Sequence, residues 1–333
     1  MSYKNTMKIF SSNFSLVWKH VLYFSLCILF FAICTYYSAK PLIELFEENM
    51  VGVEFNALFD GFYSRGNITT DIFDVLSHIF DVLLTNFGSV YMYVILFLLF
   101  AFLLPYIFFQ IANYNLCSIM YKKLSMNMTV GYFQNLVGTL KNSIIYALTN
   151  VVLSIPFWSI NIVLVEIYIG FFDNIIMRYL GLVALSGLLI LLGSVKNALT
   201  AVYVGNAVET ENLAPIAFGN SLPISLKNFA SILSTCILMK LTIVVSNGFV
   251  GIFTFFAGLI LSIPATAVLQ SVGFTVLYCN KTGQRYYLGN SFIFNPVKYA
   301  IKQDEMRSPI VIEEKVDEQI ETTIMNSRKN KKR

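Results

Sequence analysis

Two lysines lie inside long apolar stretches of the chain, where an ionisable side chain is energetically costly and often has a function. Lys196 lies about seven residues from the predicted cytoplasmic end of its stretch, so its side chain can also extend along the helix to water. Lys240 lies deeper, where it can pair with Glu166 or Asp173 or bind an anionic ligand. For both lysines the sequence leaves a structural and a functional role open.

Further polar groups follow a proline or glycine within three of the apolar stretches. The sets are Pro105 with Gln110, Gly193 with Lys196 and Asn197, and Pro264 with Gln270. Because the stretches repeat, we expect Gln110, Lys196, Asn197 and Gln270 at similar depths in the cytoplasmic half of a helical bundle. Together with Lys240 they form a candidate intramembrane polar site. Either they hydrogen-bond to one another and tie the helices together, or they line the path of a solute.

An acidic segment on the predicted outer side contains a candidate metal site. Residues 71–87 have the apolar stripe of an amphipathic helix. Asp71, Asp74, His78 and Asp81 lie on its other face, and histidine and carboxylates at this spacing are typical of metal ligands. Asp74, His78 and Asp81 are therefore candidate ligands of a divalent cation. The same pattern is typical of the wet side of a helix lying on a membrane, so we predict neither a bound metal nor a cofactor.

The composition indicates that lipid, not water, surrounds most of the chain. Of its 333 residues 56% are hydrophobic and only 13% are charged, whereas soluble domains have about 25% charged residues. Apolar runs of the ~20 residues needed to cross a bilayer occur six times. They lie near Val21 to Ala39, Tyr91 to Ile111, Ser143 to Val165, Leu180 to Tyr203, Phe229 to Val245 and Phe249 to Leu269. The sequence therefore predicts an all-α polytopic membrane protein with six transmembrane helices in residues 1–290.

The distribution of basic residues predicts the orientation in the membrane. Most connections on one side are rich in lysine, and basic residues between the spans mark the cytoplasmic side. These lysines are Lys4, Lys8, Lys19, Lys122, Lys123, Lys141 and Lys227. Both termini are therefore predicted to be cytoplasmic, with the loop 40–88 outside. The net charge of +4 follows this membrane rule and does not indicate a nucleic-acid partner.

Three similar segments suggest an internal repeat. Phe10, Phe133 and Phe218 each begin a short amphipathic segment that ends in a lysine and leads into an apolar run. We expect three units, each made of an interfacial helix and a transmembrane hairpin. The first interfacial helix is predicted over Thr6 to His20. The last two spans are joined by only Ser246 to Gly248, which predicts a tight helical hairpin there.

The remaining segment, 291–333, is predicted to be a charged and largely disordered cytoplasmic tail. Its last six residues include five basic ones, Arg328, Lys329, Lys331, Lys332 and Arg333. They can attract anionic lipid, or they can serve as a solubilising end. The cytoplasmic connectors offer surfaces for protein partners. The five cysteines contain no CxxC pair and imply no disulfide framework or metal knuckle.

One segment resembles a known group of proteins. VETENLAPIAFGNSLPISLKNFASIL (208–233) is similar to a segment of six-helix bacterial membrane domains. Such domains include the one fused to membrane-anchored glycerophosphodiester phosphodiesterases, as well as related families of unassigned function. The resemblance implies a multi-pass protein of the bacterial cytoplasmic membrane. It provides no catalytic residue, because the phosphodiesterase activity of the fused proteins belongs to a separate soluble barrel.

The sequence contains no GxSxG, HExxH or P-loop motif, and His20 and His78 are its two histidines. We therefore expect a non-enzymatic membrane protein that acts as a scaffold, assembly factor or lipid-associated accessory factor. The alternative is a transporter or permease component that uses the polar site in the bundle. A third, weaker interpretation is a lipid head-group enzyme that uses the outer acidic helix.

Overall fold

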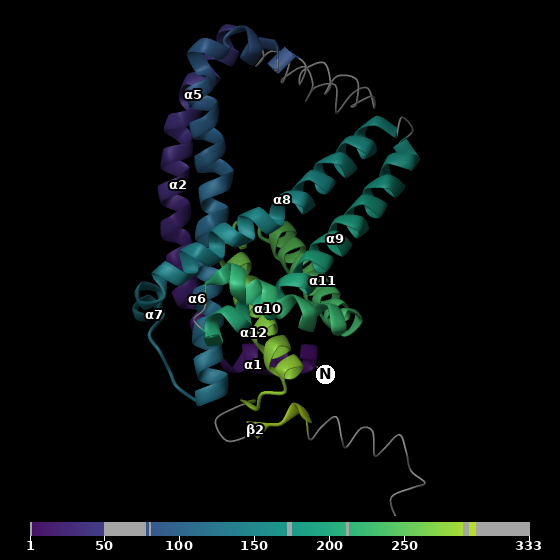
Figure 1. The fold of residues 1–333 in the computed structure, drawn as a ribbon. Coiled ribbons are helices and arrows are strands. Elements are labelled where there is room, and N and C mark those ends of the chain that lie inside the picture. The colour runs from purple at the N-terminus through teal and green to yellow at the C-terminus, as the bar shows by residue number, and fades with distance from the viewer. Residues whose placement is uncertain are drawn as a thin grey trace, which may run out of the picture.

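The computed structural model of the chain is built almost wholly from helices (Figure 1). It describes residues 2–49, 78–79, 81–171, 175–210, 213–288 and 293–297. Six helices in the described ranges are long and apolar enough to cross a membrane. The chain is therefore an all-α multi-pass membrane protein, as its composition predicts.

The helices follow one another with short connections. They are α1 (Ser2–Ser12), α2 (Ser15–Glu48), α5 (Phe87–Leu98), the π-helix η1 (Leu99–Leu103), α6 (Leu104–Met126), α7 (Tyr132–Gly138), α8 (Leu140–Phe171), α9 (Ile175–Thr210), α10 (Ala214–Lys227), α11 (Phe229–Phe253) and α12 (Leu259–Thr282). A small antiparallel pair, β1 (Tyr286–Tyr287) and β2 (Ile293–Phe294), follows them. Helix α5 continues through η1 into α6, and together they form one span. The π-helix ends just before Pro105, whose missing N–H disturbs regular α-helical bonding.

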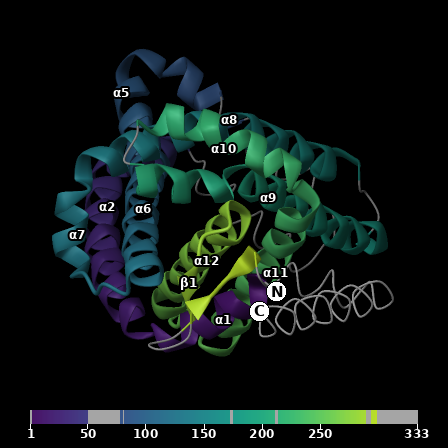
Figure 2. The same ribbon diagram turned by 60° about the horizontal axis from the view of Figure 1, so that its bottom comes forward.

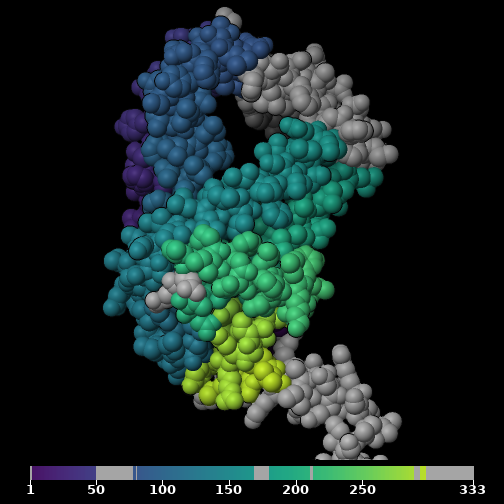
Figure 3. Space-filling view, viewed as in Figure 1, coloured from purple at the N-terminus to yellow at the C-terminus, as the bar shows by residue number. Residues whose placement is uncertain are grey.

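The short helices α1, α7 and α10 lie toward one end of the bundle, which is its lower end in Figure 1. The hairpins α2–α5 and α8–α9 extend from there toward the upper end and diverge. Figure 3 shows an opening between them. The third hairpin is shorter, because α11 and α12 have 25 and 24 residues whereas α2, α8 and α9 have 34, 32 and 36.

The core of the protein lies in the lower halves of α6, α9 and α12. These helices all contact one another. Almost every residue is buried over 110–121 in α6, 198–208 in α9 and 271–279 in α12. Two glycines allow close approach of neighbouring helices, Gly205 between α9 and α12 and Gly273 between α12 and α11. A Cβ atom on Gly205 would lie 2.2 Å from Cγ of Tyr278, and one on Gly273 would lie 2.1 Å from Sδ of Met239.

Each short helix contacts one of these three core helices. Helix α7 packs on α6, α10 packs on α9, and α1 packs on α12 (Figure 2). The contacts of α7 and α10 are therefore with the core helix that precedes them in the chain. Helix α1 contacts α12, the last core helix, so the N-terminal segment packs against the C-terminal part of the bundle. Whether the three units share one internal geometry stays a prediction.

The first short helix ends earlier than predicted. Helix α1 stops at Ser12, and His20 lies inside α2. The Ser12 hydroxyl and the Asn13 amide both donate to the Ile9 carbonyl, at 2.9 and 2.7 Å. Such bonds compete with helical backbone bonds. The local polar side chains, rather than the lysine that follows, therefore set this boundary.

The turn between the last two spans is also displaced, so the prediction of a turn at Ser246 to Gly248 was wrong. Helix α11 continues to Phe253, and Asn247 donates across the hairpin to the Thr266 hydroxyl at 3.3 Å. The chain reverses over 254–258, where the Thr254 hydroxyl accepts from the Gly258 N–H at 2.8 Å. A Cβ atom on Gly258 would lie 2.6 Å from Val250, so glycine fits this tight return best.

Alanine substitutions of the glycines test whether close packing of the core holds the bundle together. We expect Gly205→Ala to lower the free energy of unfolding by about 2 to 3 kcal/mol, because the ring of Tyr278 cannot move without disturbing the core. Gly273→Ala should cost about 1 kcal/mol, since the flexible Met239 side chain can shift. Thermal unfolding in detergent measures both effects. Gly187→Ala is the control because nothing lies within 4 Å of its new Cβ atom, and equal losses in all three variants would contradict this account.

Candidate intramembrane site

Helices α6 and α8 are joined by a ladder of polar side chains. Its members recur every three or four residues on α6 and every four residues on α8, so they follow one face of each helix. The rungs are Tyr106 with Ser154 (2.7 Å between hydroxyl oxygens), Gln110 with Asn150 (2.8 Å between amide oxygen and nitrogen) and Asn113 with Tyr146 (3.5 Å between amide nitrogen and hydroxyl oxygen). Polar groups buried in a bundle are satisfied by such partners. The ladder therefore fixes the register of α6 against α8.

The lower rung also ties in the other two core helices. The Ser271 hydroxyl of α12 donates to the Asn113 side-chain oxygen at 2.8 Å. The Tyr114 hydroxyl donates to the Ala207 carbonyl of α9 at 3.3 Å. Tyr146 stacks on Tyr203 of α9 with ring centroids 5.0 Å apart. All three core helices and α8 are thus joined at one level.

Lys196 is attached to the upper rung. Its ammonium group donates to the Tyr106 hydroxyl at 2.9 Å and lies 5.4 Å from the centroid of that ring. The Ser154 hydroxyl donates to the Asn150 carbonyl, so Ser154 accepts the hydrogen bond that the Tyr106 hydroxyl donates. A directed chain of hydrogen bonds therefore runs from Lys196 through two hydroxyls into α8. Lys196 points into the bundle and does not extend along α9 to water.

Lys240 of α11 lies beside the same helix. Its Cε and Nζ atoms lie 3.6 and 3.9 Å from the position of a Cβ atom on Gly193, which is one turn from Lys196. Glu166 is exposed and makes no ion pair in the part of the chain that the structure describes, where Lys40 with Glu44 is the one pair. The predicted pairing of Lys240 with Glu166 is therefore wrong, and Asp173 lies outside the described residues.

The predicted polar set is brought together only in part. Gln110 and Lys196 belong to neighbouring rungs, and Lys240 lies one helical turn from Lys196. Asn197 and Gln270 are partly buried, and their side chains form no hydrogen bond with any described residue. Sequence reasoning missed the partners on α8, although the four-residue spacing of Tyr146, Asn150 and Ser154 would have pointed to them. The sequence does not show which helix packs against that face of α8.

The candidate metal ligands fall on a segment that is described only in part. Asp74 and Asp71 lie outside the described residues, as does the basic tail 328–333. His78 lies in a helical stretch, and Asp81 is exposed. No group of three His, Cys, Asp or Glu side chains that could hold a metal ion occurs in the described ranges. A metal on the outer helix stays untested.

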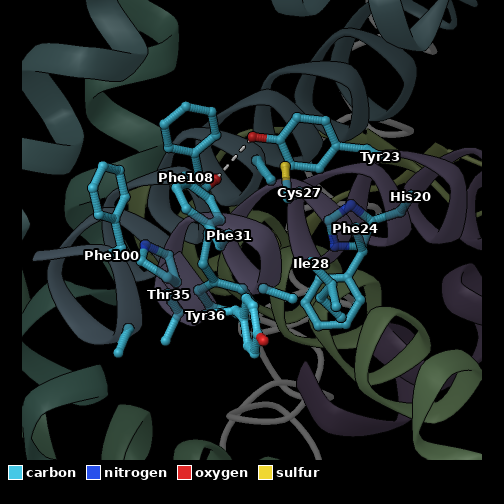
Figure 4. Close-up of a pocket in the computed structure, with 15 residues that line it drawn as sticks. His20, Tyr23, Phe24, Cys27, Ile28, Phe31, Thr35, Tyr36, Phe100 and Phe108 are labelled. Carbon is cyan, nitrogen blue, oxygen red and sulfur yellow. Dashed lines mark hydrogen bonds between the residues drawn. The ribbon is translucent and has the colours of Figure 1, made fainter. Parts of the chain in front are cut away.

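A separate cavity of about 550 Å³ lies between α2 and the η1–α6 segment (Figure 4). Its wall is mainly aromatic and aliphatic and includes Phe24, Phe31, Phe100 and Phe108. The Tyr23 hydroxyl donates to the Phe108 carbonyl at 3.1 Å and joins the two sides. The volume lies within the range of about 300 to 1,000 Å³ that is usual for sites that bind small molecules. An apolar ligand suits this wall.

One polar side chain lines this cavity without full hydrogen bonding. His20 is 1% exposed, and its Nδ1 atom lies 3.0 Å from the Tyr132 hydroxyl of α7. Burial raises the pKa of Tyr132, so this hydroxyl stays protonated and can donate to Nδ1. Nε2 then carries the imidazole proton, and it has no hydrogen-bond partner among the described residues. The cavity wall thus contains a buried polar atom, His20 Nε2, that is free to bind a ligand.

Comparisons with known proteins add no relative. No family model, curated protein or solved structure matches the chain.

Two leucine substitutions test which of the predicted polar residues support the fold. Gln110→Leu removes a rung and leaves the Asn150 amide with fewer partners, so we expect the free energy of unfolding to fall by about 1 kcal/mol. Gln270→Leu removes no hydrogen bond to a described residue and should change it by less than about 0.5 kcal/mol. Unfolding in detergent measures both variants. A larger loss for Gln270→Leu would show that the ladder is not the main polar tie.

Proposed function

We propose that the chain is a non-enzymatic accessory protein of the cytoplasmic membrane that associates with lipid and serves as a scaffold or assembly factor. The observation that carries this proposal is the apolar cavity between α2 and α6. It lies between α2 and the η1–α6 segment, and both also expose large apolar side chains, such as Leu29 and Phe102. An acyl chain of a membrane lipid has the chemistry to fill it.

The polar interior of the bundle supports the scaffold part of the proposal. Its described side chains mostly bond to one another across α6, α8, α9 and α12. Such bonds stabilise one arrangement of helices, as a scaffold requires. The exposed connectors at the lower end and the charged tail offer surfaces for protein partners and for anionic lipid. We derive no catalytic residue from this arrangement.

Filling the cavity tests the lipid association. We expect purified protein to retain a lipid that native mass spectrometry detects, and Ala32→Phe with Ala101→Phe to lose most of it, because the added rings occupy the cavity. Ala184→Phe is the matched control, since Ala184 is an exposed alanine of α9 away from the cavity. If the filled variant retained as much lipid as the control, the cavity would not be a lipid site.

We also propose that the lower end faces the cytoplasm. Lys122, Lys123 and Lys141 flank the connections there, and lysine-rich connections stay on the cytoplasmic side. The resemblance to bacterial membrane domains adds the bacterial cytoplasmic membrane to this proposal.

Thiol labelling tests the orientation. In a cysteine-free background we expect Glu166→Cys to react with a membrane-impermeant maleimide added to intact cells, because this exposed residue lies near the upper end of α8. Lys227→Cys, exposed at the end of α10, should react only after the cells are opened. Labelling of position 227 in intact cells would show that the lower end faces outward, contrary to the proposal.

The second candidate function is a transporter or permease component. It is favoured by Lys196 and Lys240, two cations within the bundle that have no carboxylate partner among the described residues. If Gln270 lines a solute path, Gln270→Leu abolishes charge movement in reconstituted membranes while stability is unchanged. Absence of any current on anion concentration jumps with the wild-type protein would leave the scaffold proposal as the better account.

A further inference from the structure

The two lysines of the bundle lie near the middle of their helices. Lys240 is the twelfth residue of the 25-residue helix α11, whose length of about 37 Å is close to the thickness of a bilayer. Lys196 lies beside it, because the Lys240 side chain packs on Gly193, one turn away on α9. Both lysine side chains therefore lie at one level of the bundle, inside helices that are candidate membrane spans.

The described residues provide no negative charge at this level. Neither lysine forms an ion pair with any carboxylate in the described ranges. An ammonium group has three N–H donors, and the one bond found for Lys196 is to the Tyr106 hydroxyl. No side-chain or backbone acceptor is found for Lys240 among the described residues. The pair therefore has a surplus of donors as well as of charge.

The surrounding structure holds these donors in place. Tyr106 accepts from Lys196 and donates to Ser154, so the hydroxyl chain fixes the ammonium group against α8. Trp158 packs edge-on against the Tyr106 ring with centroids 4.9 Å apart. The absence of a side chain on Gly193 leaves the space that Lys240 occupies. The upper rung of the ladder thus has a second role beyond joining two helices.

We propose that Lys196 and Lys240 together bind a phosphate group within the bundle. Two convergent cations with free N–H donors match the charge and the acceptor oxygens of phosphate. The group is either free phosphate or the terminal phosphate of phosphatidic acid, which differ from the phosphodiester of phosphatidylcholine in their higher negative charge, and the chemistry of recognition is shared. The site lies on α9 and α11, apart from the cavity between α2 and α6, so it does not depend on the lipid proposal above.

The test uses the full chain in nanodiscs and has two arms. In phosphatidylcholine nanodiscs, sodium phosphate replaces sodium chloride at constant ionic strength, and the unfolding temperature is followed. In the second arm the nanodiscs contain phosphatidic acid and the buffer contains no phosphate. A rise of the unfolding temperature in the first arm identifies free phosphate as the ligand, and a rise in the second arm identifies the head of phosphatidic acid. No rise in either arm would overturn the proposal.

Substitutions connect the effect to the two lysines. Lys196→Gln and Lys240→Gln should each weaken the half-saturating phosphate response at least about tenfold, whereas Lys227→Gln, at an exposed lysine outside the bundle, should leave it unchanged. Lys240→Arg keeps the charge and should keep the response, which covers the case in which a neutral variant does not fold. Gly193→Leu displaces Lys240 without changing any charge, so it should abolish the phosphate response. Gly187→Leu is the control for Gly193→Leu, because nothing lies within 4 Å of a Cβ atom at Gly187. If Gly193→Leu and both glutamine variants left the phosphate response unchanged, the site would be refuted.

Discussion

The lower halves of α6, α9 and α12 are buried on nearly every side, so the polar side chains there find most of their partners inside the protein. This constraint explains why a threonine of α12 bonds to a carbonyl of its own helix, as Thr275 does to the Ser271 carbonyl. It also explains why Asn113 accepts from Ser271. Close approach at Gly205 brings α9 next to α12, and close approach at Gly273 brings α11 next to α12.

The upper halves of the hairpins follow a different rule. Beyond the rung of Tyr106 and Ser154, α5 and the α8–α9 hairpin diverge (Figure 1), and their large side chains are exposed, as at Tyr91 and Val183. In lipid such exposure carries no penalty, because the acyl chains are as apolar as the side chains. The polar features of the bundle therefore gather at the boundary between the packed and the open half. Lys196 lies at this boundary because its partner Tyr106 does.

Composition and apolar run length predicted the number and type of the helices, because lipid imposes one strong requirement on any spanning segment. Local breaks were harder to predict. The turn at Ser246 to Gly248 looked favourable in isolation, yet Asn247 contributes more to the fold as a tie to Thr266. The polar residues were found from sequence, but their partners were not. Gln110 and Gln270 look alike in the sequence, and only the face of the neighbouring helix decides that one is bonded and the other is not.

The short helices α1, α7 and α10 connect parts of the bundle that are separate in the chain. Each of α7 and α10 leads into a hairpin but packs on the core helix before it, so neighbouring hairpins cannot separate without exposing that contact. The first short helix has no earlier unit, and it packs on α12 instead. There Asn5 donates to the Tyr286 hydroxyl at 2.7 Å, and Asn280 donates to the Ser2 hydroxyl at 3.0 Å. The N-terminal helix and the segment around the end of α12 therefore stabilise each other, and loss of either one would remove these bonds between the two ends of the bundle domain.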